Sequence, residues 1–186
     1  MMETAWIQWL REHVPIHPQA LLGMGDDAAI VALPTGGQTV VTTDMLMDGT
    51  DFRLEEIDAQ RAGYKAMAVN LSDMAAMAAQ PVAAFCSIAL PRQDGRALAE
   101  SLYQGMMPLA RQFDLALAGG DTNSWDHPLV LCITVLGAIG SQGPLTRSGA
   151  KPGDRIIVTG HFGCSILVRP LDCQPRVSEA LQLVAS

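Results

Sequence analysis

The hydrophobic and polar positions of the chain follow two periods, one typical of helices and one typical of strands. Apolar residues recur every three to four positions in four segments, which predicts amphipathic helices over about residues 3–14, 56–79, 95–113 and 175–185. Compact runs rich in Val, Ile, Leu and Ala predict strands over residues 28–33, 39–43, 83–90, 115–118, 129–139 and 155–159. The turn residues Pro34-Thr-Gly-Gly37 separate the first two strands and predict a hairpin between them.

The order of these elements predicts an α+β fold, in which a mixed β-sheet carries helices on one face. The composition changes at the polar, glycine-containing stretch 140–153, which is the best candidate for a domain boundary. We therefore divide the chain into a domain over residues 1–140 and a linker with the start of a second domain over residues 141–186. Because the second part is too short to form a core of its own, we expect it to be incomplete.

Composition and charge exclude several classes of protein. The 186 residues are 49% hydrophobic and 17% charged, which is typical of a globular protein. The net charge of -7 argues against a nucleic-acid-binding surface, because such surfaces are basic. No run of about 20 apolar residues predicts a membrane span, and the N-terminus lacks the basic start and apolar core of a signal peptide. We expect a cytoplasmic protein whose four cysteines are reduced.

Six aspartates lie within or directly after apolar runs, where a carboxylate is costly. They are Asp26, Asp27, Asp44, Asp51, Asp73 and Asp121. Two like charges about 4 Å apart repel by about 1 kcal/mol in water and by about 4 kcal/mol at an effective dielectric near 20. A cluster of carboxylates is therefore tolerated mainly when a hard divalent cation neutralises it, and Mg²⁺ takes oxygen ligands of this kind. Together with the neighbouring glycine turns, the pattern predicts a site for magnesium and a polyphosphate.

Each of the shorter motifs has an ordinary structural alternative. Gly25-Asp26-Asp27 is as typical of a turn as of a metal site. Thr42-Thr43-Asp44 ends a predicted strand, where threonine is common, but its two hydroxyls and carboxylate also suit a cation. Gly119-Gly120-Asp121-Thr122 is either a simple turn or a place where the backbone approaches a ligand closely. Arg147 is either a solvated loop arginine or a phosphate contact.

Asp73 is the strongest single candidate. It lies on the side of the predicted helix opposite the stripe formed by Tyr64, Met67 and Leu71, yet residues 66–79 are apolar nearly all round the helix. Such helices are usually buried, and an ionised group in one needs a partner. Asn70, three residues earlier, shares the side of Asp73 and is placed to orient it. We therefore favour a metal-ligand role for Asp73 over a solvent-exposed one.

Five motifs occur in the order found in thiamine-monophosphate kinases, a family within the superfamily of aminoimidazole ribonucleotide synthetase. They are Gly23-Met-Gly-Asp-Asp-Ala-Ala29, Thr42-Thr-Asp44, Tyr64-Lys-Ala-Met-Ala-Val-Asn-Leu-Ser-Asp-Met-Ala-Ala-Met77, Gly119-Gly-Asp-Thr122 and Leu145-Thr-Arg-Ser-Gly-Ala-Lys-Pro-Gly-Asp154. The chain resembles that family over about residues 3–186. The resemblance implies an ATP- and Mg²⁺-dependent kinase that converts thiamine monophosphate to thiamine diphosphate. It also implies a homodimer formed through the sheet of the N-terminal domain.

The resemblance assigns roles to individual residues. It implies magnesium ligands at Asp27, Thr42, Thr43, Asp44, Asp73 and Asp121. It places Gly120, Asp121 and Arg147 against the nucleotide, the last of them on the ATP phosphates. No catalytic side chain is expected, because in-line phosphoryl transfer between the two substrates needs no protein nucleophile.

The chain departs from the family pattern in two places. The family commonly has a substrate-touching histidine where this chain has Asp51, whose carboxylate suits the cationic thiazolium better than a phosphate. The family's second domain, with further metal and nucleotide ligands, has no counterpart after Ser186, so we expect little kinase activity from these residues alone. Two alternatives stay open: another enzyme of the superfamily, such as an aminoimidazole ribonucleotide synthetase, or a non-catalytic remnant that dimerises or binds nucleotide.

Overall fold

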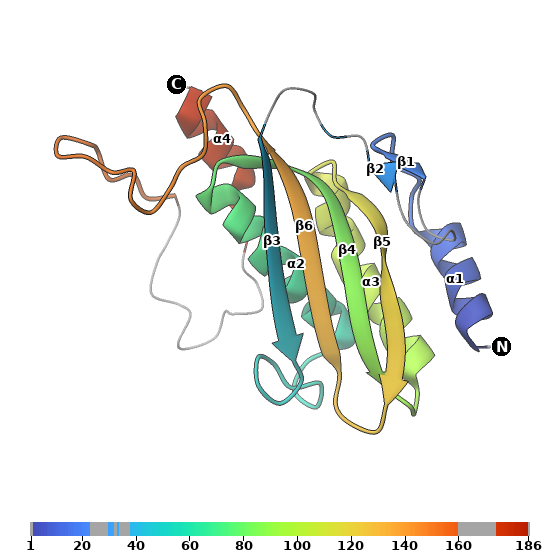
Figure 1. Cartoon of the computed structure of the whole chain (residues 1–186). Helices are drawn as coiled ribbons and strands as arrows, with labels where there is room; N and C mark the ends of the chain where they lie inside the picture. Colours follow the sequence, from blue (N-terminus) through green and yellow to red (C-terminus); the bar gives the residue numbers. More distant parts are fainter. Residues whose placement is uncertain (1, 23–29, 32, 34–37, 160–173, 186) are drawn as a thin grey trace.

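The protein is a two-layer α+β structure, seen in a computed structural model that describes residues 2–22, 30–31, 33, 38–159 and 174–185 (Figure 1). The helices are α1 (Met2–His13), α2 (Ala59–Ala76), α3 (Gly95–Gln112) and α4 (Val177–Ala185). The strands are β1 (Ala20–Leu22), β2 (Ile30–Val31), β3 (Thr39–Met47), β4 (Ala79–Pro91), β5 (Ala116–Trp125) and β6 (Val130–Ile139). None of the described helices is both long and apolar enough to cross a membrane.

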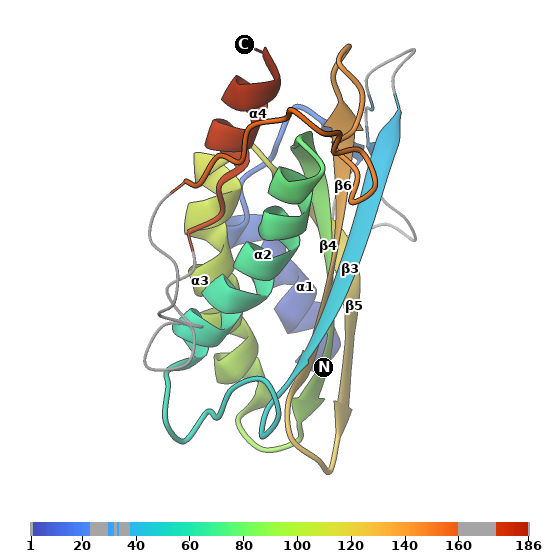
Figure 2. The ribbon, with the colours of Figure 1, turned by 90° about the vertical axis from the view of Figure 1, so that its left-hand side faces the viewer.

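Four strands form the main sheet in the order β3-β6-β4-β5, so that β3 and β5 are its two edges. The pairs β3–β6 and β4–β6 are antiparallel, and β4 pairs with β5 in parallel. Figure 2 shows the sheet edge-on, with α2, α3 and α4 in a layer on one side of it. The other side, called the open face below, carries no helix among the described residues. The predicted α+β class, with a mixed sheet and helices on one face, is confirmed.

Three predicted elements are wrong in pairing or extent. Residues 30–31 pair with β1 in a small separate sheet rather than forming a hairpin with β3, which pairs with β6. Residues 155–159 have no regular secondary structure, although their run of apolar residues predicted a strand. Strand β5 continues to Trp125 through Gly119 and Gly120, although the predicted strand ended at residue 118.

The core lies between the sheet and helices α2 and α3. Asp58 caps α2, because its Oδ1 accepts a hydrogen bond of 2.7 Å from the backbone N–H of Arg61. The helix then presents Met67, Leu71 and Met74, all fully buried, as the predicted stripe requires. Fully buried residues from α3 and the sheet complete this layer: Leu102, Met106, Leu109, Leu131, Ile133 and Val135. The burial of these side chains fixes α2 over the sheet.

Helices α2 and α3 approach each other at two glycines. A Cβ at Gly63 would lie 2.1 Å from the carbonyl oxygen of Leu102, and one at Gly105 would lie 1.9 Å from that of Gln60. Neither position has room for a side chain, because the obstacle in each case is the backbone of the other helix. The two glycines therefore set the distance between α2 and α3.

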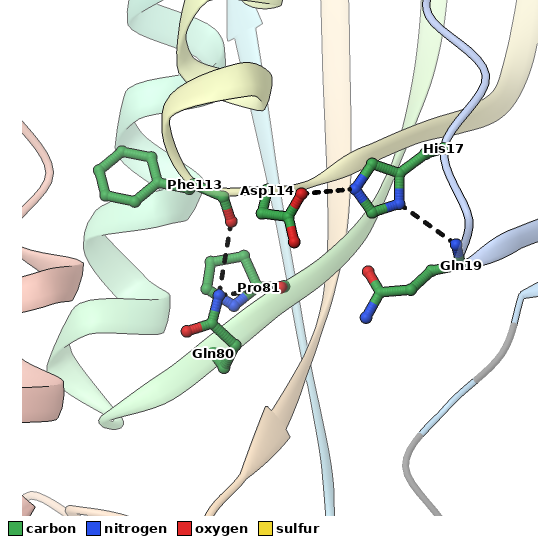
Figure 3. Close-up of polar contacts among 6 residues, drawn as sticks. All are labelled: His17, Gln19, Gln80, Pro81, Phe113 and Asp114. Carbon is green, nitrogen blue, oxygen red and sulfur yellow. Dashed lines mark hydrogen bonds and ion pairs between the residues drawn. The ribbon is translucent and has the colours of Figure 1, made fainter.

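The N-terminal segment is attached to the helix layer and to β5 by polar contacts. His17 bonds through Nε2 to Oδ1 of Asp114 at 3.0 Å, and its Nδ1 accepts the backbone N–H of Gln19 (Figure 3). Nδ1 is thus an acceptor, so Nε2 carries the proton that is donated to Asp114. Farther along, Nε1 of Trp6 donates a 3.1 Å hydrogen bond to Oγ1 of Thr122. These contacts hold α1 and the following loop beside β5.

We expect Gly105→Ala to lower the free energy of unfolding by about 1–3 kcal/mol, the usual cost of overpacking. In a helix with free space the same change would stabilise the chain by up to about 1 kcal/mol, so the sign of the effect reports the helix contact. Urea unfolding measures it. Gly140→Ala is the control, because a Cβ at Gly140 has nothing within 4 Å. A midpoint for Gly105→Ala at or above that of the unaltered chain would contradict the proposed packing.

Candidate functional site

Strand β3 presents alternate residues to the two faces of the sheet. Val40, Thr42, Asp44 and Leu46 are half-buried or buried on the helix side, whereas their odd-numbered neighbours are exposed on the open face. This alternation is the ordinary period of a strand. It separates the predicted motif, because Thr42 and Asp44 face α2 while Thr43 points the other way.

Thr42 and Asp73 are joined directly. Oγ1 of Thr42 donates a hydrogen bond of 2.7 Å to Oδ2 of Asp73, connecting the edge strand to the last turns of α2. Asp73 is exposed, so the prediction that it lies in a buried helix surface is wrong. The side of α2 that carries Ser72, Asp73 and Ala76 faces outward at the sheet edge. The residue is nevertheless held in place, by a hydroxyl on the strand rather than by burial.

Asp44 lies close enough to Asp73 for the two charges to interact. Burial raises the pKa of the Asp44 carboxyl above its ordinary value, and the charge on Asp73 raises the pKa further. A cation between the two groups would remove this repulsion. The described residues contain no cluster of three or more His, Cys, Asp or Glu side chains arranged for a metal, and they contribute two carboxylates, Asp44 and Asp73, to this site. Mg²⁺ is commonly bound through one or two carboxylates and keeps several waters or phosphate oxygens as further ligands.

A buried amide lies near this pair. Asn70 is fully buried, and its Nδ2 donates a hydrogen bond of 3.1 Å to the carbonyl oxygen of Ala66. Its Oδ1 has no hydrogen-bond partner within the described ranges of the chain, and leaving such an acceptor unpaired costs about 1–3 kcal/mol. The oxygens of Asp44, Asp73 and Thr42 are hard ligands of the kind that Mg²⁺ takes. These residues therefore fit a magnesium ion.

The two remaining hydroxyl and carboxylate candidates lie on the open face. Oγ1 of Thr43 is 3.0 Å from Oγ1 of Thr134 and 3.4 Å from Sγ of Cys132. Asp121 is in register with Ser87, which is in register with Cys132, so its side chain also points to the open face. Strands β3 and β5 are three positions apart, or about 14 Å at about 4.8 Å per strand. Within one chain, Asp121 therefore does not join Asp44 and Asp73.

Gly120 has a structural reason to be glycine. A Cβ at this position would lie 1.9 Å from the carbonyl oxygen of Cys86 on β4. The close approach that the sequence predicted is therefore made to the neighbouring strand.

On the helix side of β5, a cavity of about 330 Å³ is lined by Trp6, Arg96 and Thr122 among other residues. The Trp6–Thr122 hydrogen bond beside it joins residues 116 positions apart, and no local pattern predicts it.

Arg147 lies on an exposed segment that is anchored near the end of α2. The backbone N–H of Leu145 donates a 3.2 Å hydrogen bond to the carbonyl oxygen of Met77, four residues after Asp73. Arg147 follows two residues later and is exposed. The anchor brings the arginine to the same end of α2 as Asp73, while its phosphate-binding role stays a prediction.

Asp51 shapes the turn that follows β3. Its Oδ2 accepts a 2.7 Å hydrogen bond from the backbone N–H of Met47, and its own N–H donates to the carbonyl oxygen of Met47. Nζ of Lys65 donates to the Asp51 carbonyl oxygen. These contacts explain an aspartate here without a ligand, and contact with a substrate stays a prediction. Asp27 lies outside the described residues.

Comparison with known proteins identifies the family. Residues 25–139 match the family model "AIR synthase related protein, N-terminal domain", which covers more than half of the chain, so the chain belongs to this family. A thiamine-monophosphate kinase from Rhodopirellula baltica is 40% identical over 189 residues, covering 98% of this chain and 59% of that protein. The chain thus spans little more than half the length of this curated relative.

Two solved structures show the same fold. The crystal structure of a thiamine-monophosphate kinase from Stenotrophomonas maltophilia has a TM-score of 0.63 and 37% identity, covering 77% of this chain and 43% of its own. The structure described as "AaThiL complexed with AMPPCP and TMP" has a TM-score of 0.53 and covers 74% of this chain and 40% of its own. At 23% identity, the second similarity shows the fold alone.

We expect Asp73→Asn to lower the pKa of Asp44 in the metal-free protein. The change removes the charge of Asp73 but leaves burial, the larger cause, so the pKa falls only part of the way to its ordinary value. The pKa of Asp44 is higher in the folded than in the unfolded state, so the protonated carboxyl favours folding. This contribution to the free energy of unfolding is lost as pH rises through the folded pKa. The contribution that is lost is smaller in Asp73→Asn. Carbon-13 NMR titration of the carboxyl measures the pKa.

Asp126→Asn is the control for this titration. Asp126 is an exposed carboxylate that pairs with Arg92 at 2.8 Å, beyond the end of β5. Its replacement leaves the Asp44 titration unchanged. An equal pKa of Asp44 in the unaltered chain and in Asp73→Asn would show that the two carboxylates do not interact.

Proposed function

We propose that this chain forms the N-terminal part of an ATP- and Mg²⁺-dependent kinase that phosphorylates thiamine monophosphate to thiamine diphosphate. The observation that carries the proposal is the convergence of Thr42, Asp44 and Asp73 between β3 and α2. The thiamine-monophosphate kinase from R. baltica supports it through 40% identity along nearly the whole chain. The crystal structure of a thiamine-monophosphate kinase from S. maltophilia supports it further, with 37% identity and a TM-score of 0.63.

The residues of this chain act by positioning and by charge. Asp44 and Asp73 would hold Mg²⁺, which supplies neutralisation of the charge on the transferring phosphoryl group. Thr42 fixes one oxygen of Asp73 and leaves the other for a ligand. Arg147 follows a segment anchored to the end of α2 and would contact the nucleotide phosphates. Transfer runs in line from the γ-phosphate to a phosphate oxygen of the acceptor, and no side chain is consumed.

We further propose that two copies of the chain associate through their open faces. Val41, Met45 and Met47 on β3 are 59%, 61% and 39% exposed on this face, an unusual amount of apolar surface on one strand. A two-fold dimer of this kind can place the β5 edge of one copy beside the β3 edge of the other. Asp121 and Thr43, both on the open face, would then approach each other across the interface. The geometry supports a site completed by the partner copy, because one chain keeps these residues apart.

The kinase proposal predicts ADP release that depends on thiamine monophosphate and Mg²⁺. The assay uses this chain joined to the part of the R. baltica relative that lies outside the matched residues. Asp73→Asn is expected to lower the rate by about 10²-fold or more, as does the loss of other groups that stabilise transition-state charge. Asp126→Asn is the matched control and keeps the rate. Absence of turnover in the joined protein rejects the kinase, whereas turnover only with aminoimidazole ribonucleotide precursors supports a different enzyme of the superfamily.

The dimer proposal predicts that two inactive variants restore each other. In a mixture of Asp44→Asn and Asp121→Asn, half of the dimers contain one copy of each, and each of these has one site free of substitutions. About a quarter of the unaltered activity is expected after the subunits exchange. If each site is built within one chain, every site in the mixture carries a substitution and the activity stays at background. Mixing Asp44→Asn with Asp73→Asn is the negative control, because both residues belong to the same chain's site.

A further inference from the structure

Asn70 is the one polar residue among the described part of the chain that is buried as deeply as the core. Its exposed fraction is 0%, the same as that of Met67, Leu71 and Met74 around it. Its Oδ1 is buried and finds no partner among the described residues. A leucine has the same branching at Cγ and would occupy this position without the cost of an unpaired acceptor. The amide here therefore calls for a partner that the described part of the chain does not provide.

The hydrogen bond that Asn70 does make does not explain the residue. Its Nδ2 donates to the carbonyl oxygen of Ala66, which lies four residues earlier in the same helix. In α2 that carbonyl already accepts the backbone N–H of residue 70, as in any regular α-helix. The side-chain bond is thus a second bond to a satisfied group. It orients the amide, with the nitrogen turned to the helix and Oδ1 turned away from it.

The position of Asn70 on the helix brings it beside the acidic pair. At about 100° per residue, Asn70 and Asp73 differ by about 60° around the axis of α2, with a rise of about 4.5 Å. Asp73 lies at the rim, bonded to Thr42, and Met74 lies on the far side of Asn70, buried against Gly137 of β6. Asn70 therefore faces the sheet between the rim and the core. Because β3 and α2 run in opposite directions (Figure 1), the turn of Asn70 is level with the part of β3 that follows Thr42, where Asp44 lies.

We propose that Oδ1 of Asn70 is the inner oxygen of the magnesium site formed by Asp44 and Asp73, in contact with the ion or with one of its bound waters. This assignment rests on the proposed function only in taking Mg²⁺ as the ion. A neutral amide oxygen suits the place, since it adds a hard ligand without a third negative charge beside two carboxylates. The site would then have a buried neutral ligand on its core side and two charged ligands on its outer side. Oδ1 of Asn70 would gain a partner when the ion binds.

The test is the binding of Mg²⁺ alone to the metal-free chain, measured by calorimetry and by the shift in melting temperature. Asn70→Leu keeps the branching at Cγ and removes the oxygen, and we expect its dissociation constant for Mg²⁺ to rise at least about tenfold. Its metal-free melting temperature shows whether the larger side chain is accommodated, since loss of an unpaired buried acceptor favours folding and overpacking opposes it. Asn70→Asp keeps an oxygen at the same place and adds charge, so it melts lower without metal and gains more from Mg²⁺.

Met74→Leu controls for a change of packing. It alters a fully buried side chain one turn later on α2 without touching a polar atom, and its Mg²⁺ affinity is expected to stay within twofold. Equal Mg²⁺ affinity in Asn70→Leu and the unaltered chain overturns the assignment of Asn70. An equal loss of Mg²⁺ affinity in Asn70→Leu and Asn70→Asp also overturns the assignment, because a change of packing would then explain both. If Asn70→Leu does not fold, the Mg²⁺ affinity of Asn70→Asp compared with that of the unaltered chain decides whether Asn70 is a ligand.

The same titration separates this inference from the proposed function. If Asp73→Asn abolishes Mg²⁺ binding and Asn70→Leu does not, the metal site stands and only the role of Asn70 is wrong. If the unaltered chain binds no Mg²⁺, both the inner ligand and the metal site of the proposed kinase are rejected.

Discussion

The candidate site depends on one hydrogen bond between an edge strand and a helix. Thr42 donates to Asp73 at 2.7 Å, and this bond brings the Asp73 carboxylate next to Asp44, two residues along the same face of β3. Burial raises the pKa of Asp44, and repulsion by the charge on Asp73 raises it further. Like charges held together by a folded protein cost stability unless a counter-ion is present. The fold thus holds an arrangement that is unfavourable alone and favourable with a cation.

The rest of the domain keeps α2 at the distance this bond requires. Met67, Leu71 and Met74 bury one side of the helix, and Gly63 and Gly105 bring α3 into backbone contact with it. Asp58 fixes where α2 begins. A shift of α2 by a fraction of its pitch would separate Asp73 from Thr42, because a hydrogen bond weakens steeply with distance and angle. Close packing in the core therefore keeps Thr42 and Asp73 within hydrogen-bonding distance.

Local patterns predicted the elements whose structure is decided locally. The 3.6-residue period and the flanking residues gave α3 within one residue at its end and α2 within three residues at each end. The pairing of residues 30–31 was predicted wrongly, because the turn residues 34–37 indicated a hairpin with the following strand, whereas the partner is the preceding segment Ala20–Leu22. The extension of β5 through Gly119 and Gly120 was missed for a related reason. Glycine signals a turn locally, whereas here Gly120 is required by the nearby backbone of Cys86.

The site shows the same limit of sequence reasoning. Thr42, Asp44 and Asp73 lie together, as a shared site requires, while their role as metal ligands stays a prediction. The argument from burial was wrong for Asp73, which is exposed. Asp121 was grouped with them by charge, and only the sheet register shows that it points to the other face from the opposite edge. The alternation along a strand sets which face of the sheet a residue occupies. The register between strands sets which residues lie beside it on that face. Asn70 was noticed for its spacing from Asp73, while its complete burial and unpaired oxygen come from the packed structure.

The most direct test of the central claim is anomalous diffraction from crystals of the chain soaked in Mn²⁺, an ion that takes the same oxygen ligands as Mg²⁺. The account predicts an anomalous peak bounded by the carboxylates of Asp44 and Asp73 on the helix side of β3. Crystals that show Mn²⁺ bound elsewhere, with no peak between these two aspartates, would contradict it.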